Sequence, residues 1–272
     1  MRQRLLSIPL SILLIAVPAA SPAQDAHHHN TSVDAIATAV ASPARDPKNR
    51  LRDQYRHPVE TLGFFDVKPN QTLVEFLPGA GWYTEILAPF LKDKGHYIAL
   101  VPSAEDAPTK AKAMLEKGGE NYGRPTLATI DFENGSTTVP VGSVDRVLTF
   151  RNVHNLVMGG EQRPKLVFDA FFAMLKPGGV LGVVDHRLPE TADATAEKTS
   201  GYVKRSTVIK LAESAGFKLA SESVINANPK DTANWPQGVW TLPPTLALGD
   251  QDRAKYIAIG ESDRMTLKFV KP

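Results

Sequence analysis

The sequence predicts an α/β fold in which a doubly wound, mainly parallel sheet carries helices on both faces. Seven short apolar runs of strand length follow one another from residue 72 onward. Segments with apolar residues at helical spacing lie between most of these runs and are long enough to connect parallel neighbours. A tight turn with two glycines follows the first run, where sheets of this kind usually bind their ligand.

The elements can be placed in order from these patterns. Strands are expected at 72–77, 96–101, 125–130, 144–150, 180–185, 217–224 and 264–270. Helices are expected at 82–91, 107–117, 167–174 and 208–215, the third of them ending at LKPGG because proline and glycine stop a helix. Residues 46–67 have helical character in pieces, interrupted at His57-Pro58. About forty irregular residues separate the last two strands, which is unusually long.

The composition is that of an ordinary folded protein and excludes several classes of function. The 272 residues are 42% hydrophobic and 22% charged, which is enough apolar material for one sizeable core. The formal net charge is +2 and the basic residues are spread along the chain, so no nucleic-acid-binding surface is expected. The chain has no cysteine, which excludes disulfide bonds, thiol nucleophiles and cysteine metal ligands.

The first residues have the anatomy of a cleavable signal peptide, assigned to 1–23. A basic start precedes the apolar run Leu5–Val17, which is too short to span a bilayer comfortably. Ser21 and Ala23 place small residues at the −3 and −1 positions of a cleavage site. We therefore expect cleavage after Ala23 and a periplasmic or secreted protein without stable membrane insertion, with an uncleaved anchor as the alternative.

Two further regions follow the signal peptide. Residues 24–45 are rich in Ala, Ser, Thr and His and are expected to be a mobile leader, whose His27–His29 run binds metal only adventitiously. Residues 46–272 are expected to form a single domain. The sequence carries no feature that indicates an oligomeric state.

The glycine turn is the first candidate for a ligand site. Gly79 and Gly81 follow the first strand and precede a helix, so their backbone can approach a ligand beside free N–H groups at the helix start. A dinucleotide-binding motif would have a third glycine where Thr84 stands and an acid after the second strand, where Val101 stands. The turn therefore indicates either a different ligand or a purely structural role.

Several sequences together point to a known family. The chain resembles the class I S-adenosylmethionine-dependent methyltransferases, and more narrowly a group of exported bacterial predicted methyltransferases, over about residues 52–272. The resemblance is carried by FLPGAGWYTEILAP, FRNVHNL, LKPGGVLGVVDHR and SDRMTLKFVKP. It implies a Rossmann-like seven-stranded sheet of order 3-2-1-4-5-7-6 with the last strand antiparallel. It also implies S-adenosylmethionine as cofactor and methyl transfer to a small-molecule acceptor.

The resemblance also implies which residues hold the cofactor. Leu77 stands where the family has its first glycine, at a position expected to face the preceding strand, and Pro78 is expected to stiffen the turn. The acid that holds the ribose hydroxyls is missing at Val101, and Glu105 or Asp106 in the following loop is a candidate substitute. The implied cofactor contacts are Glu75, Gly79, Ala80, Gly81, Tyr83, Asp131, Phe132 and Asn152.

Candidate catalytic residues follow the fourth and fifth strands. His154 is the best candidate for a general base because imidazole titrates near neutral pH, and Arg151 is suited to orienting an anionic substrate. Asp185 is expected either to orient a histidine or to form an ion pair with Arg187. His154, Asp185 and His186 are alternatively the ligands of a metal site, and polar loop residues that serve only the backbone remain a further alternative.

A segment before the first strand offers one more candidate. Tyr55, Arg56 and His57 are expected either to close over the pocket or to lie on a plain surface helix. Three functions remain open at this point. They are an exported methyltransferase, a non-catalytic ligand-binding protein on a methyltransferase scaffold, and a metal-dependent hydrolase using His154, Asp185 and His186. The second is favoured by the compartment, because S-adenosylmethionine is made in the cytosol.

Overall fold

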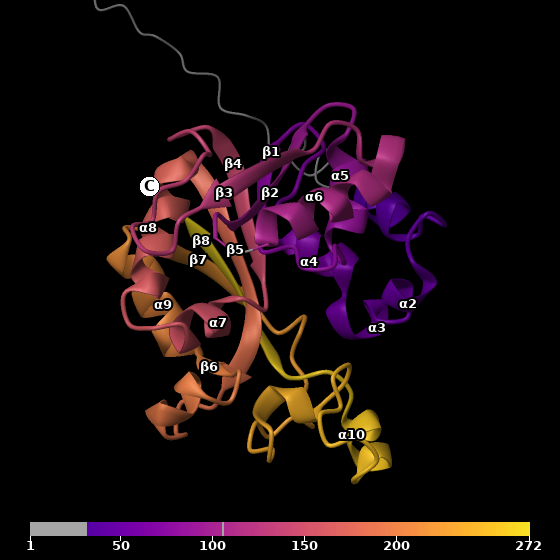
Figure 1. Cartoon of the computed structure of the whole chain (residues 1–272), viewed down its shortest axis with the longest axis vertical. Helices are drawn as coiled ribbons and strands as arrows, with labels where there is room; N and C mark the ends of the chain where they lie inside the picture. The colour runs from indigo at the N-terminus through magenta and orange to yellow at the C-terminus, as the bar shows by residue number, and fades with distance from the viewer. Residues whose placement is uncertain (1–31, 105) are drawn as a thin grey trace, which may run out of the picture.

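The computed structural model describes residues 32–104 and 106–272, which form a twisted sheet between two layers of helices (Figure 1). The sheet order is β3-β2-β1-β4-β5-β8-β7, with β8 antiparallel to both of its neighbours and β6 pairing only with the end of β5. Without the two-residue β6, this is the predicted order of seven strands, so the fold class is confirmed. The strands are β1 Thr72–Phe76, β2 His96–Pro102, β3 Thr126–Ile130, β4 Val144–Phe150, β5 Leu175–Leu188, β6 Val203–Lys204, β7 Lys218–Ser223 and β8 Arg264–Val270.

The helices lie close to where apolar spacing predicts them. The interruption at His57 is confirmed, because this residue has a left-handed backbone with φ of 40° between two short helices. A helix over residues 32–40 comes first. The others are α2 Pro47–Arg50, α3 Asp53–Arg56, α4 Pro58–Phe64, α5 Thr84–Leu91, α6 Ala107–Gly118, α7 Val153–Met158, α8 Arg163–Met174, α9 Arg205–Ser214 and α10 Arg253–Ile259, with 3₁₀ turns η1 Gly119–Tyr122, η2 Ala194–Lys198 and η3 Gly238–Thr241.

Two apolar clusters fill the two faces of the sheet. On one face, side chains of α8 and α9 such as Phe171 and Val208 pack against alternate residues of the central strands. On the other face, α4 and α5 pack against the intervening residues through side chains such as Leu62 and Leu87. Successive residues of a strand point to opposite faces of the sheet. The side chains of β1 on both faces are buried, as a parallel sheet covered on both sides requires.

The region before α2 differs from the sequence prediction. Residues 32–45 were expected to belong to a mobile leader, yet Ile36 is 1% exposed and packs in the core with α4 and α5. Arg45 is buried as well and pairs with Asp53 at 2.7 Å. The periodic apolar pattern in this stretch covers only a few residues, which is why its helix was not predicted. The predicted signal peptide, residues 24–31 and the His27–His29 run lie outside the described residues.

Strand register brings the candidate catalytic residues to one edge of the sheet. Phe150 at the end of β4 pairs with Val184 of β5, so the residues that follow both strands are neighbours. His186 in turn pairs with Arg264 at the start of β8. The irregular stretch between β7 and β8, which contains η3 and α10, lies beyond this edge at the bottom of Figure 1. No helix within the described residues is long and apolar enough to cross a membrane.

Candidate active site

The turn after β1 has a left-handed backbone at three positions. Leu77, Gly79 and Gly81 have φ values of 52°, 59° and 88°. Only glycine adopts this region without penalty, and another residue pays about 1–2 kcal/mol. Leu77 therefore has the conformation of the glycine it replaces, while its side chain packs against the core, as the sequence suggests. Its amide donates to the Leu100 carbonyl at 2.9 Å, which ties the turn to β2.

The two glycines serve different purposes. A Cβ on Gly79 would meet no atom within 4 Å, so this exposed position faces open space. A Cβ on the buried Gly81 would lie 3.0 Å from the sulfur of Met114 in α6. Gly81 thus permits close packing of the turn on α6, whereas Gly79 and the exposed Ala80 present the turn to a ligand.

Glu75 is turned away from the open side of the turn. Its Oε2 accepts hydrogen bonds from Tyr97 at 2.6 Å and from Thr84 at 2.9 Å, inside the layer beneath α5. Burial raises the pKa of Glu75 to about 7, although these hydrogen bonds act in the opposite direction. Thr84, which stands at the third-glycine position, therefore anchors the first turn of α5 to β1. The side chain of Glu75 therefore stabilises the turn through Thr84 and Tyr97 on the side away from the open space.

Asn152, implied as a cofactor contact, links the fourth strand to the first. Its side-chain amide donates to the carbonyls of Phe76 at 2.9 Å and Leu77 at 3.3 Å. These two bonds fix the strained turn relative to the residues that follow β4. Asn152 therefore holds the glycine turn and the residues after β4 in a fixed position relative to each other.

Asp131 and Phe132, after β3, belong to a small loop. Asp131 accepts hydrogen bonds from the Glu133 amide at 2.8 Å and the Asn134 side chain at 2.9 Å, which closes an Asx-type turn. Phe132 packs on Phe76 with ring centroids 6.2 Å apart. Both residues stand at the carboxyl edge of the sheet, where the resemblance places the adenine end of the cofactor.

None of the described residues directly after β2 is a buried acid. Val101 is buried, and Asp106 at the start of α6 is exposed and pairs with Lys110 at 2.7 Å. Glu105 lies outside the described residues. Among the described residues of this loop, the ribose position therefore lacks the carboxylate that the resemblance leads one to expect.

Tyr83 lies between the turn and the end of β4. Its ring stacks on Phe150 with centroids 3.5 Å apart and an interplanar angle of 12°. Its hydroxyl donates to the carbonyl of Arg56 at 3.4 Å. Burial raises the pKa of Tyr83 to about 12, so the side chain stays neutral. Tyr83 thus joins the glycine turn to α3 and shields the region from water.

His154 and Asp185 form the buried pair that one reading of the sequence predicts. Nδ1 of His154 lies 2.7 Å from Oδ1 of Asp185. Oδ2 of the same carboxylate accepts from the amides of Val153 at 2.6 Å and His154 at 3.1 Å, and Oδ1 also accepts from the His186 amide. Because a carboxylate only accepts, Nδ1 carries the hydrogen of this bond and Nε2 points away from Asp185. The alternative pairing is wrong, since Arg187 binds Asp263 instead.

His186 completes this group. Its ring centroid lies 5.0 Å from that of His154, and Nδ1 hydrogen-bonds the hydroxyl of Ser262. Burial, and then the charges of His154 and Arg151, lower the pKa of His186 well below its ordinary value. His186 is therefore a neutral ring that packs against the base and holds the segment before β8.

The same three residues meet the distance requirement of a metal site but not its chemistry. Ligand atoms of His154, Asp185 and His186 lie within 4.8 Å of one another. Both oxygens of Asp185 are already occupied by four hydrogen bonds. The positive charge of Arg151 also reaches this group, and a divalent cation is disfavoured beside it. The arrangement fits a hydrogen-bonded base better than a metal centre.

The segment before β1 reaches the same edge of the sheet. Arg56 is 3% exposed, so the plain surface helix considered for this segment is wrong. Its guanidinium lies 4.5 Å from the ring centroid of Trp82, and it faces Glu261, which pairs with Arg52 at 2.6 Å. Sequence reasoning did not predict a role for Glu261, because it follows a long stretch without a periodic pattern. The SDRMTLKFVKP sequence directly after it was noted only for the resemblance that it carries.

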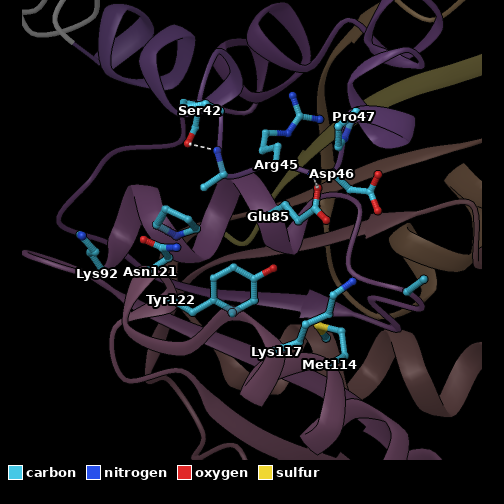
Figure 2. Close-up of a pocket in the computed structure, with 15 residues that line it drawn as sticks. Ser42, Arg45, Asp46, Pro47, Glu85, Lys92, Met114, Lys117, Asn121 and Tyr122 are labelled. Carbon is cyan, nitrogen blue, oxygen red and sulfur yellow. Dashed lines mark hydrogen bonds between the residues drawn. The ribbon is translucent and has the colours of Figure 1, made fainter.

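A separate groove of about 520 Å³ lies between residues 42–47, α5, α6 and η1 (Figure 2). Glu85, Lys92, Met114 and Tyr122 line it, together with charged residues of both signs. Ala80 is the only predicted site residue that lines this groove. The groove therefore lies apart from the His154–Asp185 pair, and we assign no chemistry to it.

Comparison with known proteins identifies the fold. No protein-family model matches the chain, and no curated protein matches it. A methyltransferase dependent on S-adenosylmethionine from Aquifex aeolicus superposes with a TM-score of 0.54 at 17% identity, covering 84% of this chain and 94% of that one. The chain has a methyltransferase fold. A sarcosine dimethylglycine methyltransferase, described as putative, from Galdieria sulphuraria gives 0.53 at 14% identity, covering 82% and 84%.

Other solved structures show how widely this methyltransferase fold is used. A phosphoethanolamine N-methyltransferase from Haemonchus contortus, in complex with S-adenosylhomocysteine, gives a TM-score of 0.54 at 17% identity, over 80% of this chain and 53% of that one. The [4+2]-cyclase SpnF gives 0.54 at 14% identity, over 95% and 99%. Similarity at this level establishes the fold, and the chemistry must be argued from the site.

Proposed function

We propose that this protein is an S-adenosylmethionine-dependent methyltransferase that acts on a small-molecule acceptor. The observation that carries the proposal is the buried His154–Asp185 pair at the ends of β4 and β5, beside the glycine turn of a methyltransferase fold. A hydrogen-bonded imidazole in this position is suited to take a proton from an acceptor.

The glycine turn fits one end of such a cofactor. Gly79 presents its Cα to open space and Ala80 is exposed, so the backbone at these positions is free to contact a ligand. Asn152 and Tyr83 hold the turn against the end of β4. When bound, S-adenosylmethionine would supply a methyl group activated on a positively charged sulfur. The missing acid at Val101 predicts weaker contacts at the ribose end.

The side chains of the protein have three tasks in this proposal. Asp185 fixes the tautomer of His154, which leaves Nε2 to accept the proton of the methyl acceptor. Tyr83 and Phe150, stacked on each other, keep water away from the reacting groups. The backbone around Gly79 places the cofactor, since positioning supplies much of the catalysis in a displacement reaction.

The deciding experiment measures binding and transfer separately. Calorimetric titration with S-adenosylhomocysteine should show saturable binding, and incubation with labelled S-adenosylmethionine and a panel of small acceptors should show methyl transfer. Saturable binding without transfer to any acceptor would support a non-catalytic ligand-binding protein, which the absent ribose acid and the expected compartment favour as second candidate. Absence of binding would refute both.

Export remains part of the proposal. It rests on residues 1–23, whose basic start, apolar run and small residues favour cleavage after Ala23. Mass spectrometry of the protein from its native host should find Gln24 as the first residue. Detection of intact Met1 in a membrane fraction would refute cleavage and favour an anchor.

A further inference from the structure

Four arginine side chains gather around Glu261 at the edge of the sheet that carries His154. Nε of Arg52 lies 2.6 Å from Oε1 of Glu261, and Nε of Arg56 lies 3.4 Å from Oε2. Nη1 of Arg264 is 3.3 Å from the same Oε2. Arg151 follows β4, where its amide donates to the Val184 carbonyl of β5 at 2.7 Å, and its charge lowers the pKa of Arg56. We call Arg52, Arg56, Arg151 and Arg264 the arginine cluster.

The arginine cluster carries hydrogen-bond donors that no described residue satisfies. Nη2 of Arg52 and Nη2 of Arg56 are buried and lack a partner within the described part of the chain. Arg151 is partly buried, and none of its nitrogens is among the buried unsatisfied donors of the described residues. Arg264 differs, since it donates to the Tyr55 carbonyl at 2.6 Å and has a structural role. Buried guanidinium donors without acceptors are costly, so Arg52 and Arg56 each keep one donor available for a partner.

The balance of charges around the arginine cluster also favours a bound anion. The four guanidinium groups face two carboxylates, Glu261 and Asp185, and Asp185 is already occupied by His154. Burial would raise the pKa of Glu261, but Arg264, Arg56 and Arg52 together lower it. Burial and the neighbouring arginines lower the pKa of Arg151 to about 10. An excess of buried positive charge is destabilising unless an anion compensates it.

The position of the cluster connects it to the proposed chemistry. The charges of the cluster act on the pKa of Tyr83, which follows the glycine turn. They also act on the pKa of His186, which packs against His154. An anion bound here would lie beside both the turn and the base. A guanidinium fork matches carboxylate and phosphate oxygens in shape and in donor number.

We propose that the arginine cluster binds a carboxylate or phosphate group, and that the methyl acceptor is therefore a small organic acid or phosphate ester. The part of this inference that concerns the acceptor rests on the proposed function. The part that concerns anion binding stands on the unpaired donors and the charge excess alone. Phosphate and carboxylate share this chemistry, so the experiment must separate them.

The test titrates the purified full chain with sodium phosphate and with citrate at constant ionic strength, with sodium chloride as reference. Calorimetry or thermal unfolding should show saturable binding of one of the two probes, and the stronger probe identifies the class of anion. Arg151→Gln should weaken that binding by roughly 10- to 100-fold, the loss expected for hydrogen bonds to a charged group. Arg205→Gln, which removes an exposed ion pair with Glu222, is the matched control and should bind normally.

Two further measurements keep the outcomes separate. Without anion, Arg151→Gln should unfold at the same or a higher temperature than the parent protein, because a repelling charge is removed. A clearly lower unfolding temperature with unchanged anion binding would make Arg151 structural and overturn the inference. Arg52→Gln, at a partly buried position, is a second variant with the same expected loss of anion affinity. If S-adenosylhomocysteine binds but neither anion does, the anion site is refuted and the proposed function stands. If an anion binds but S-adenosylhomocysteine does not, the anion site stands and the proposed function is refuted.

Discussion

Nδ1 of His154 and Oδ1 of Asp185 lie 2.7 Å apart, joined across the ends of two neighbouring parallel strands. This distance makes Asp185 the residue that sets the tautomer of the histidine. The carboxylate also accepts the amides of Val153 and His154 at the start of α7, so one side chain orients the base and holds the helix that carries it.

The first prediction concerns His154. His154→Ala should lower the rate of methyl transfer by about 10²–10⁴-fold, the usual contribution of a general base. Affinity for S-adenosylhomocysteine should change by no more than a few-fold, because the glycine turn is untouched. Steady-state rates and calorimetry check the two parts. His96→Ala, a partly exposed histidine bonded to Thr126, is the control and should retain full activity. Full activity in His154→Ala would remove this residue from the mechanism.

The second prediction separates the two glycines of the turn. Gly79→Val should abolish binding of S-adenosylhomocysteine, because the new side chain enters the open space that the turn presents. Gly142→Val is the matched control, since Gly142 has a similar φ of 63° and also faces open space, but it precedes β4 at the opposite edge of the sheet. Both variants should lose about the same stability in urea unfolding from backbone strain. Equal ligand affinity in the two variants would make the turn merely structural.

The third prediction concerns the strained leucine in that turn. Leu77→Gly and Leu77→Ala both lose the packing of the side chain, but only glycine relieves the left-handed backbone. Leu77→Gly should therefore be more stable than Leu77→Ala by about 1 kcal/mol. This reverses the usual order, in which glycine is the less stable of the two. The free energies of unfolding in urea decide it, and a more stable alanine variant would show that the turn relaxes around position 77.

The fourth prediction follows from the raised pKa of Glu75. Between its ordinary value of 4.5 and about 7, Glu75 binds a proton more tightly in the folded than in the unfolded chain. Its contribution to the free energy of unfolding is therefore fully present below pH 4.5 and is lost as the pH rises through 7, by a total of about 3 kcal/mol. Urea unfolding at several pH values should show this decline, and Glu75→Gln should flatten it.

The control for this pH dependence is Glu133→Gln, at an exposed position after β3. It should leave the decline between pH 4.5 and 7 as it is in the parent protein. The idea would be refuted by a Glu75→Gln variant whose stability still falls over this range with the original slope.

The fifth prediction addresses the metal alternative. Dialysis against a chelator should leave both the unfolding temperature and the binding of S-adenosylhomocysteine unchanged, because Asp185 has no free oxygen to offer an ion. Metal analysis of the protein should find less than one ion per chain. The variant used should lack His27–His29, so that adventitious binding expected of this run is removed from the measurement. A stoichiometric ion that depends on His154 would restore the hydrolase hypothesis.

The elements of the sheet were predictable because their signals are local. Apolar runs and intervening helical spacing placed β1 to β4 within a few residues, although β5 begins at Leu175, before the expected start at 180. Because parallel strand ends meet at one edge, the sequence offered a pairing of Asp185 with a histidine as one alternative and an ion pair with Arg187 as the other, and the structure shows the pairing with His154. The side of the strand on which Glu75 lies could not be read from the motif. It is decided by the alternation of faces together with its partners Thr84 and Tyr97, which are distant in sequence.

The arginine cluster was beyond reach of the same reasoning. Arg56 and Glu261 meet only because β8 inserts beside β5, and no periodic signal spans the 205 positions between them. The helix at 32–40 was missed for a related reason, since Ile36 is stabilised by contacts with α4 and α5 and not by a long pattern of its own.

The place of β8 has a consequence for how the molecule is made. This strand is synthesised after all the others, yet it lies inside the sheet, between β5 and β7. Until it emerges, both neighbours present unpaired edges, and Arg264 and Glu261 are not yet in place. A nascent or truncated chain therefore lacks a finished sheet and a finished site at once, and its open edges favour aggregation. The sheet can therefore be completed only once β8 is available.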